Sequence, residues 1–76
     1  MNTNTTQLIA LRVEAGRTVA GKTRALLARE TGIPLSTLRR KLAGHDDFTV
    51  PQLQAACVHL GLSFITVISN LPKVAA

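Results

Sequence analysis

The stretch LARETGIPLSTLRRKLAG, Leu27–Gly44, carries the strongest structural signals in this chain of 76 residues. Gly32 favours the left-handed backbone that ends a helix, so a first helix is expected over residues 23–31. Pro34 favours the start of a second helix, expected over residues 35–43. Two helices of about nine residues joined by a short turn have the spacing of a helix-turn-helix unit.

Three further helices are expected around this unit. Apolar residues recur at helical spacing over residues 6–20. A fourth helix opens with the capping box Thr49–Gln52 and ends before Gly61. A fifth starts at Ser63 and is stopped by Pro72. The expected fold class is therefore all-α, a compact five-helix bundle with a helix-turn-helix.

The last predicted element leaves an alternative open. Residues 63–70 include a β-branched run that is also typical of a strand, although helix is favoured. The predicted organisation is a flexible N-terminal tail over residues 1–6, one helix-turn-helix domain over residues 7–71, and a C-terminal tail over residues 72–76.

Composition and charge narrow the classes of partner. The formal net charge is +5, and eight of the nine Lys and Arg residues fall between Arg12 and Lys41. This balance favours an acidic partner such as nucleic acid. The chain has no Trp or Tyr, which disfavours single-strand binding by base stacking and leaves duplex binding open. No apolar run is long enough to span a membrane. The single cysteine, Cys57, indicates a small core residue and a reduced, cytoplasmic location.

The segment over residues 35–43 divides into two faces. Leu35, Leu38 and Leu42 fall on one side and require a core. The other side has cations and hydroxyls and no acid: Ser36, Thr37, Arg39 and Arg40, with Lys41 at the flank. An α-helix fits the major groove, where Arg binds guanine and Ser or Thr contacts bases or phosphates. We expect Ser36, Thr37 and Arg40 nearest the bases, and Lys22, Arg24, Arg39 or Lys41 on phosphates.

The same stretch resembles the helix-turn-helix core of phage lambda repressor/Cro-like regulators. The resemblance rests on Leu27-Ala28, Gly32, Ile33, Leu38 and Gly44, and on similar downstream positions through about Ile68. It implies sequence-specific binding of double-stranded DNA by a phage-type repressor or Cro-like switch. It also implies backbone contact by Arg24 and recognition positions at Leu35, Ser36, Thr37, Arg39 and Arg40. Leu35 is apolar where the family often has a polar reader, and Ala43 replaces a frequent Asn.

Members of this family often bind palindromic sites as dimers, and pairing doubles the length of DNA that is read. The surface expected to form a homodimer is Leu62, Phe64, Ile65 and Ile68. Edge pairing of a C-terminal strand is the alternative.

Two further motifs resemble sites of other functions. GRTVAGKT, residues 16–23, matches the phosphate-binding pattern G-x-x-x-x-G-K-[ST], but no parallel sheet is expected around it. His45-Asp46-Asp47 is interpreted as a loop, because no further metal ligands are near it in sequence. No enzymatic activity, metal, cofactor, small-molecule substrate or membrane partner is expected. A protein–protein module on the same fold, such as an antirepressor or antitoxin-like protein, is the main alternative.

Overall fold

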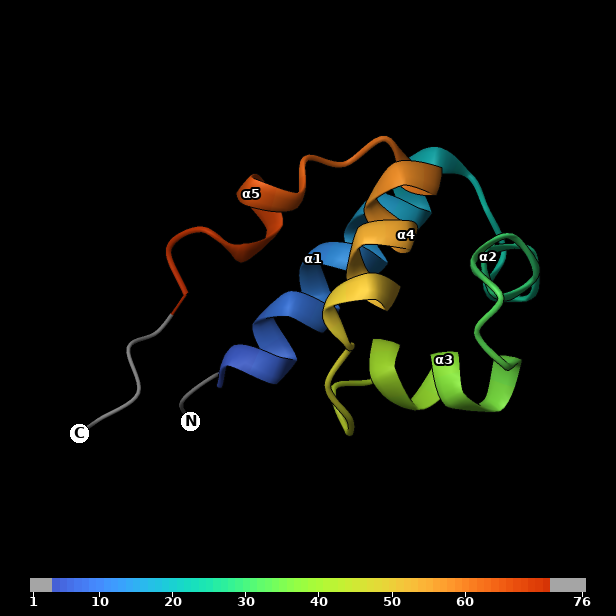
Figure 1. The fold of residues 1–76 in the computed structure, drawn as a ribbon, viewed down its shortest axis with the longest axis horizontal. Coiled ribbons are helices and arrows are strands. Elements are labelled where there is room, and N and C mark those ends of the chain that lie inside the picture. Colours follow the sequence, from blue (N-terminus) through green and yellow to red (C-terminus); the bar gives the residue numbers. More distant parts are fainter. Residues whose placement is uncertain (1–3, 72–76) are drawn as a thin grey trace.

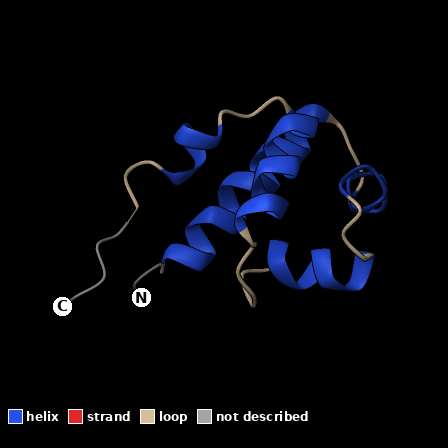
Figure 2. Ribbon diagram, viewed as in Figure 1, coloured by secondary structure: helices blue, strands red, loops and turns tan. Residues whose placement is uncertain are grey.

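A computed structural model describes residues 4–71 and shows an all-α fold (Figures 1 and 2). Its helices are α1 (Thr5–Ala20), α2 (Arg24–Thr31), α3 (Leu35–Leu42), α4 (Val50–Leu60) and α5 (Phe64–Ile68). No strand occurs within the described residues. The five predicted helices are confirmed, and the strand alternative for residues 63–70 is wrong.

The local capping signals act as expected in two helices. Thr23 caps α2 by accepting a hydrogen bond from the amide of Leu26, and Gly32 ends it with a φ of 77°. At α4, Thr49 and Gln52 form both hydrogen bonds of the capping box, and Gly61 ends the helix. These groups satisfy backbone donors and acceptors that a helix end leaves open.

The first helix begins earlier than the sequence pattern predicts. Asn4 is its N-cap and forms a capping box with Gln7. Thr5 and Thr6, assigned above to a flexible tail, lie inside α1. The outer tail residues, 1–3 and 72–76, lie outside the described part of the chain.

Helices α3 and α5 end earlier than expected. Ala43 is the C-cap of α3, with Gly44 next in a left-handed conformation. The α5 helix stops at Ile68, although apolar spacing suggested that it continued to Leu71. Arg12 on α1 donates to the carbonyl of Val67, which would accept from residue 71 in a longer helix.

The helices meet around one core. Helix α4 packs against α1 and α2, α3 packs against α1 and α2, and α5 covers one side of α1 and α4. In Figure 1, α2 is seen nearly end-on while α3 lies across the view. Val13, Leu27 and Leu38 are completely buried, so α1, α2 and α3 each supply a central core side chain. This packing leaves the other side of α3 at the surface.

Candidate nucleic-acid interface

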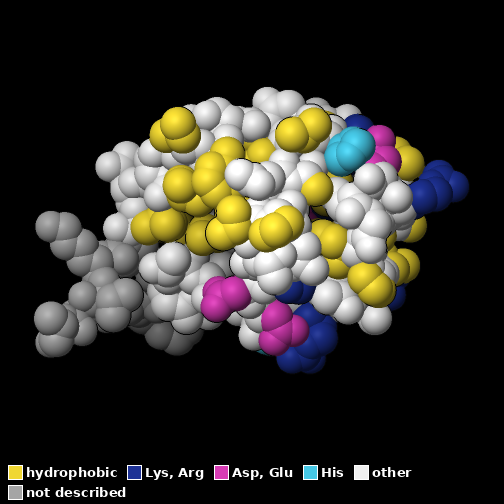
Figure 3. Space-filling model, in the orientation of Figure 1, with side chains coloured by type: hydrophobic (Ala, Val, Ile, Leu, Met, Phe, Trp, Pro, Cys, Tyr) yellow, Lys and Arg dark blue, Asp and Glu magenta, His cyan; other side chains and the backbone are white. Residues whose placement is uncertain are grey.

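The outer face of α3 is polar and cationic. Ser36, Arg39 and Arg40 are exposed, and Thr37 is half-buried. On the inner face, Leu38 is fully buried and Leu42 nearly so. Lys and Arg side chains reach the lower edge of the molecule in Figure 3, where α3 lies, beside carboxylates. The predicted division of this helix into two faces is thus confirmed.

Leu35 belongs to the inner face. It is partly buried and packs against the core cluster. The base-reading position that the resemblance implies for Leu35 stays a prediction, because the side chain is divided between contact with the core and the surface. The leucine spacing already placed Leu35 with Leu38, and that assignment is the one the structure supports.

Lys41 is a structural residue. It is only 8% exposed, although it was expected to reach a phosphate. Its Nζ donates to the carbonyl of Asp47 at 2.6 Å and to Oε1 of Gln52 at 2.7 Å. It also lies 5.9 Å from the centre of the Phe48 ring. Lys41 therefore links α3 to α4, and its ammonium group is not part of the exposed cationic face of α3.

Lys22 is also held within the protein. Its Nζ donates to Oε1 of Glu30 at 2.8 Å and to the carbonyl of His59 at 2.9 Å. These contacts connect the α1–α2 turn to α2 and α4. The hydrogen-bonded ammonium group is not positioned as the phosphate contact that was expected.

Arg24 at the start of α2 is half-exposed and paired. Its Nη2 lies 3.0 Å from Oε1 of Glu14, which also accepts hydrogen bonds from Arg17. Burial of the Glu14 carboxyl opposes its ionisation, but the hydrogen bonds and charges of Arg17 and Arg24 outweigh that effect and lower the pKa of Glu14. The Arg24 guanidinium keeps half of its surface toward solvent.

Arg39 differs from the other predicted contact cations. It is exposed, and no hydrogen bond or ion pair is formed by its side chain within residues 4–71. Arg39 and Arg24 line a small surface cavity of about 200 Å³ together with Leu42 and Ala43. Two arginine residues from different helices, Arg24 on α2 and Arg39 on α3, thus line one depression.

Arg40 forms an ion pair that the sequence pattern did not indicate. Its Nε donates to Oδ2 of Asp46 at 2.8 Å. The hydrogen bond and charge of Arg40 lower the pKa of Asp46. Asp46 was assigned to a loop without a role. The left-handed Gly44, with φ of 83°, turns the chain so that this loop passes back beside α3.

The predicted dimer surface divides into two parts. Leu62 and Phe64 are partly buried and pack against the core. Ile65 is 72% exposed, and Ile68 is exposed to a smaller degree. Of these four side chains, Ile65 and Ile68 are exposed, whereas Leu62 and Phe64 are only partly exposed.

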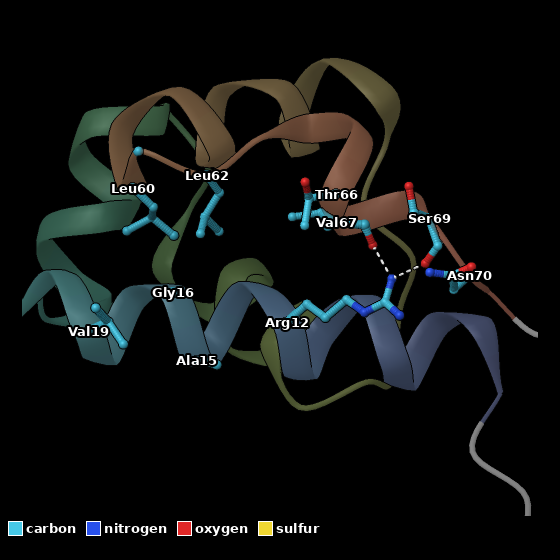
Figure 4. A pocket seen from close by; sticks show the side chains of 11 residues that line it. Arg12, Ala15, Gly16, Val19, Leu60, Leu62, Thr66, Val67, Ser69 and Asn70 are labelled. Atoms are coloured by element: carbon cyan, nitrogen blue, oxygen red, sulfur yellow. Dashed lines mark hydrogen bonds between the residues drawn. The ribbon is translucent and has the colours of Figure 1, made fainter.

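A groove of about 790 Å³ lies between α1, the end of α4 and α5 (Figure 4). Leu60, Leu62 and Val67 contribute apolar walls, and Gly16 lies on the α1 side. Arg12 closes one end, where its Nη1 donates to the carbonyls of Val67 at 2.7 Å and Ser69 at 2.5 Å. The groove is on the side of the molecule that carries α5, apart from the outer face of α3.

The nucleotide-binding pattern does not form a phosphate loop. Residues 16–20 lie inside α1, where backbone amides are bonded within the helix. Lys22, its fixed lysine, pairs with Glu30. Within residues 4–71, no group of three or more His, Cys, Asp or Glu side chains is placed to hold a metal ion. No helix in the same part of the chain has the length and apolar character needed to cross a membrane.

Comparisons of the chain with protein-family models, curated proteins and solved structures find no match.

Proposed function

We propose that this protein is a sequence-specific double-stranded-DNA-binding regulator, a phage-type repressor or Cro-like switch, whose α2 and α3 act as a helix-turn-helix. The observation that carries the proposal is Arg39. It is an exposed cation on α3 with no acidic partner in the described chain, and it borders a depression shared with Arg24. A phosphate group placed there lies next to two arginine residues, and guanidinium groups bind phosphate with charge-assisted hydrogen bonds.

The exposed face of α3 supplies the base-reading groups. Ser36 lies in the first turn, and Arg40 follows it by four residues, about 6 Å further along the helix axis. An α-helix enters the major groove, where hydroxyl and guanidinium groups contact base edges. We therefore place Ser36, Thr37 and Arg40 toward the bases and Arg24 and Arg39 toward phosphates. We leave Lys22, Leu35 and Lys41 out of this contact set, because their side chains contact the protein itself.

The smaller set of phosphate contacts gives a quantitative expectation. Each neutralised phosphate contributes a slope of about −0.9 to log affinity against log salt. With Arg24 and Arg39 as phosphate contacts, one subunit gives a slope of about −2, and a dimer gives about twice that value.

The proposal is tested by selecting binding sites from random duplex DNA with the purified protein. A salt titration of the selected duplex follows. We expect a common sequence to emerge and Arg39→Ala to reduce the magnitude of the slope by about 1 for each bound subunit, which is about 2 for a dimer. We expect Arg40→Ala to cost about 1–3 kcal/mol and to relax the preference at one base pair. Equal affinity for every duplex sequence would contradict the proposal and favour a protein–protein module on this fold.

We further propose that two subunits pair through α5. Ile65 and Ile68 leave an apolar surface on this helix, next to the groove that it forms with α1. Two-fold pairing would present two α3 helices to one DNA site and double the sequence that is read.

A further inference from the structure

Arg40 and Asp46 form an ion pair across the turn that follows α3. Oδ2 of Asp46 accepts from Nε of Arg40 at 2.8 Å, and both side chains are substantially exposed, at 62% for Arg40 and 45% for Asp46. A single exposed ion pair of this kind contributes little to folding stability. We therefore consider the effect of the ion pair on the orientation and charge of the Arg40 side chain instead of its effect on folding stability.

The contact uses one edge of the guanidinium group. Arginine has five N–H donors in a rigid plane, one on Nε and two on each Nη atom. Asp46 binds the Nε donor, and no hydrogen bond of the described chain uses Nη1 or Nη2 of Arg40. The end of the guanidinium thus keeps two adjacent donor groups for another partner.

A partner of the Nη1 and Nη2 donors needs two adjacent hydrogen-bond acceptors. In the major groove, guanine presents O6 and N7 side by side, whereas adenine presents one acceptor and one donor. A single phosphate oxygen is a weaker competitor for Arg40, because the Asp46 carboxylate already supplies a negative charge to this guanidinium. Arg39, the neighbouring residue, has no such carboxylate and keeps its full charge for phosphate.

We propose that Asp46 is a positioning residue that orients Arg40 to read a guanine. This inference rests on the proposed DNA-binding function. Asp46 itself touches no base in this arrangement. It restricts the rotation of a flexible side chain and directs the Nη1 and Nη2 donors toward one base edge, so less conformational freedom is lost on binding.

The test compares three variants on the selected duplex and on the three duplexes that differ from it at the base pair where Arg40→Ala relaxes the preference. Asp46→Ala removes the carboxylate. Asp46→Asn removes the charge but keeps an oxygen that accepts from Nε. Asp47→Asn is the matched control, because it removes a neighbouring negative charge whose carboxylate accepts from Thr6 and not from Arg40. Circular dichroism melting checks that each variant is folded.

We expect the preference for guanine at this base pair to fall by about tenfold in Asp46→Ala, within the range of a bidentate arginine contact. Asp46→Asn keeps most of the preference, and Asp47→Asn keeps all of it. All three variants bind arbitrary duplex DNA somewhat more tightly, because each has lost a negative charge that repels phosphate.

An unchanged guanine preference in folded Asp46→Ala would overturn the inference while leaving the proposed function standing. The same conclusion follows if the wild-type protein discriminates among duplexes but Arg40→Ala relaxes no base pair. If the wild-type protein discriminates among no duplexes, the proposed function fails and the inference fails with it.

Discussion

The side chain of Leu62 packs directly on the backbone of Gly16. A Cβ atom added at Gly16 would lie 2.5 Å from Cδ1 and 3.0 Å from Cγ of Leu62. A side chain at position 16 therefore requires the Leu62 side chain to move, because the segment after α4 approaches α1 so closely. The glycine also lies on one wall of the groove between α1 and α5.

Gly16→Ala is expected to lower the free energy of unfolding by about 1 kcal/mol. Alanine is favoured over glycine in a helix by about 1 kcal/mol, but overpacking against Leu62 costs about 1–3 kcal/mol. In a Leu62→Ala background the clash is gone, so the same substitution should stabilise the protein. Urea denaturation of the four proteins measures both effects. The same sign in both backgrounds would contradict this account.

Leu38→Asp is expected to unfold the domain. Leu38 is fully buried between the helices, and an unpaired carboxylate at this site loses its hydration without gaining a partner. Ser36→Asp is the matched control on the outer face of α3, where the new charge remains hydrated and lies near the helix N-terminus. Far-ultraviolet circular dichroism should show a folded Ser36→Asp variant and an unfolded Leu38→Asp variant. A helical Leu38→Asp protein would mean that α3 is oriented differently.

Lys41→Ala and Arg39→Ala should separate stability from DNA binding. Loss of the Lys41 ammonium leaves the Asp47 carbonyl without its donor and takes one of two donors from the Gln52 amide oxygen, which still accepts from the Thr49 amide, so we expect a loss of about 1–3 kcal/mol in stability. Arg39 makes no such contact in the described chain, so its removal should leave stability within about 0.5 kcal/mol. Thermal melts and salt titrations of DNA binding measure the two properties. Equal stability of both variants would contradict the structural role of Lys41.

Acid should weaken the fold partly through Glu14. Its pKa is lowered in the folded protein relative to an ordinary value of 4.5, so the unfolded chain takes up this proton at higher pH. The stability that Glu14 contributes is therefore present above pH 4.5 and is lost as the pH falls through the folded pKa. Glu14→Gln should be less stable at neutral pH and should show a shallower loss of stability in acid. Denaturation at a series of pH values measures the slope, and an unchanged acid slope would exclude Glu14 as a contributor.

Ile65→Asp should prevent self-association with little effect on folding, if two subunits pair through α5. Ile65 is well exposed on this helix, and a charge there would have to be buried in the proposed dimer. Val50→Asp is the control, because Val50 is an exposed apolar residue at the start of α4. Sedimentation at DNA-binding concentrations should show a dimer for wild type and Val50→Asp, and a monomer for Ile65→Asp. A wild-type protein that sediments as an 8.1 kDa monomer would exclude the dimer.

Most of the helical boundaries follow from local chemistry. Helices α2 and α4 begin at the caps Thr23 and Thr49 and end at a glycine. Each of these residues acts within a few positions of its own helix, so its effect can be predicted from the sequence. The ends of α1 and α5 were less predictable. Asn4, which the predicted organisation places in the N-terminal tail, is the cap of α1. The early end of α5 coincides with the hydrogen bond from Arg12, 55 residues earlier, to the carbonyl of Val67.

The candidate site also combines features that the sequence predicts with features that only the fold determines. Helical periodicity alone placed Leu38 inward and Arg40 outward. It did not distinguish cations that face solvent from those that bind the protein itself. Lys41 is adjacent to Arg40 in sequence, yet its ammonium is held by a backbone carbonyl and an amide side chain. Every residue has a backbone carbonyl, so the order of side chains does not indicate which carbonyl will accept a hydrogen bond. Such contacts therefore cannot be predicted from the sequence pattern.

The sequence by itself determined four helices and the two faces of α3 and favoured a fifth helix over a strand, because caps, turn residues and apolar spacing act over one or two helical turns. Only the tertiary structure decided which cations remain available, that Gly16 makes room for Leu62, and that Asp46 reaches Arg40. Those outcomes depend on distances between groups that the fold brings together, and local backbone preferences do not specify such distances.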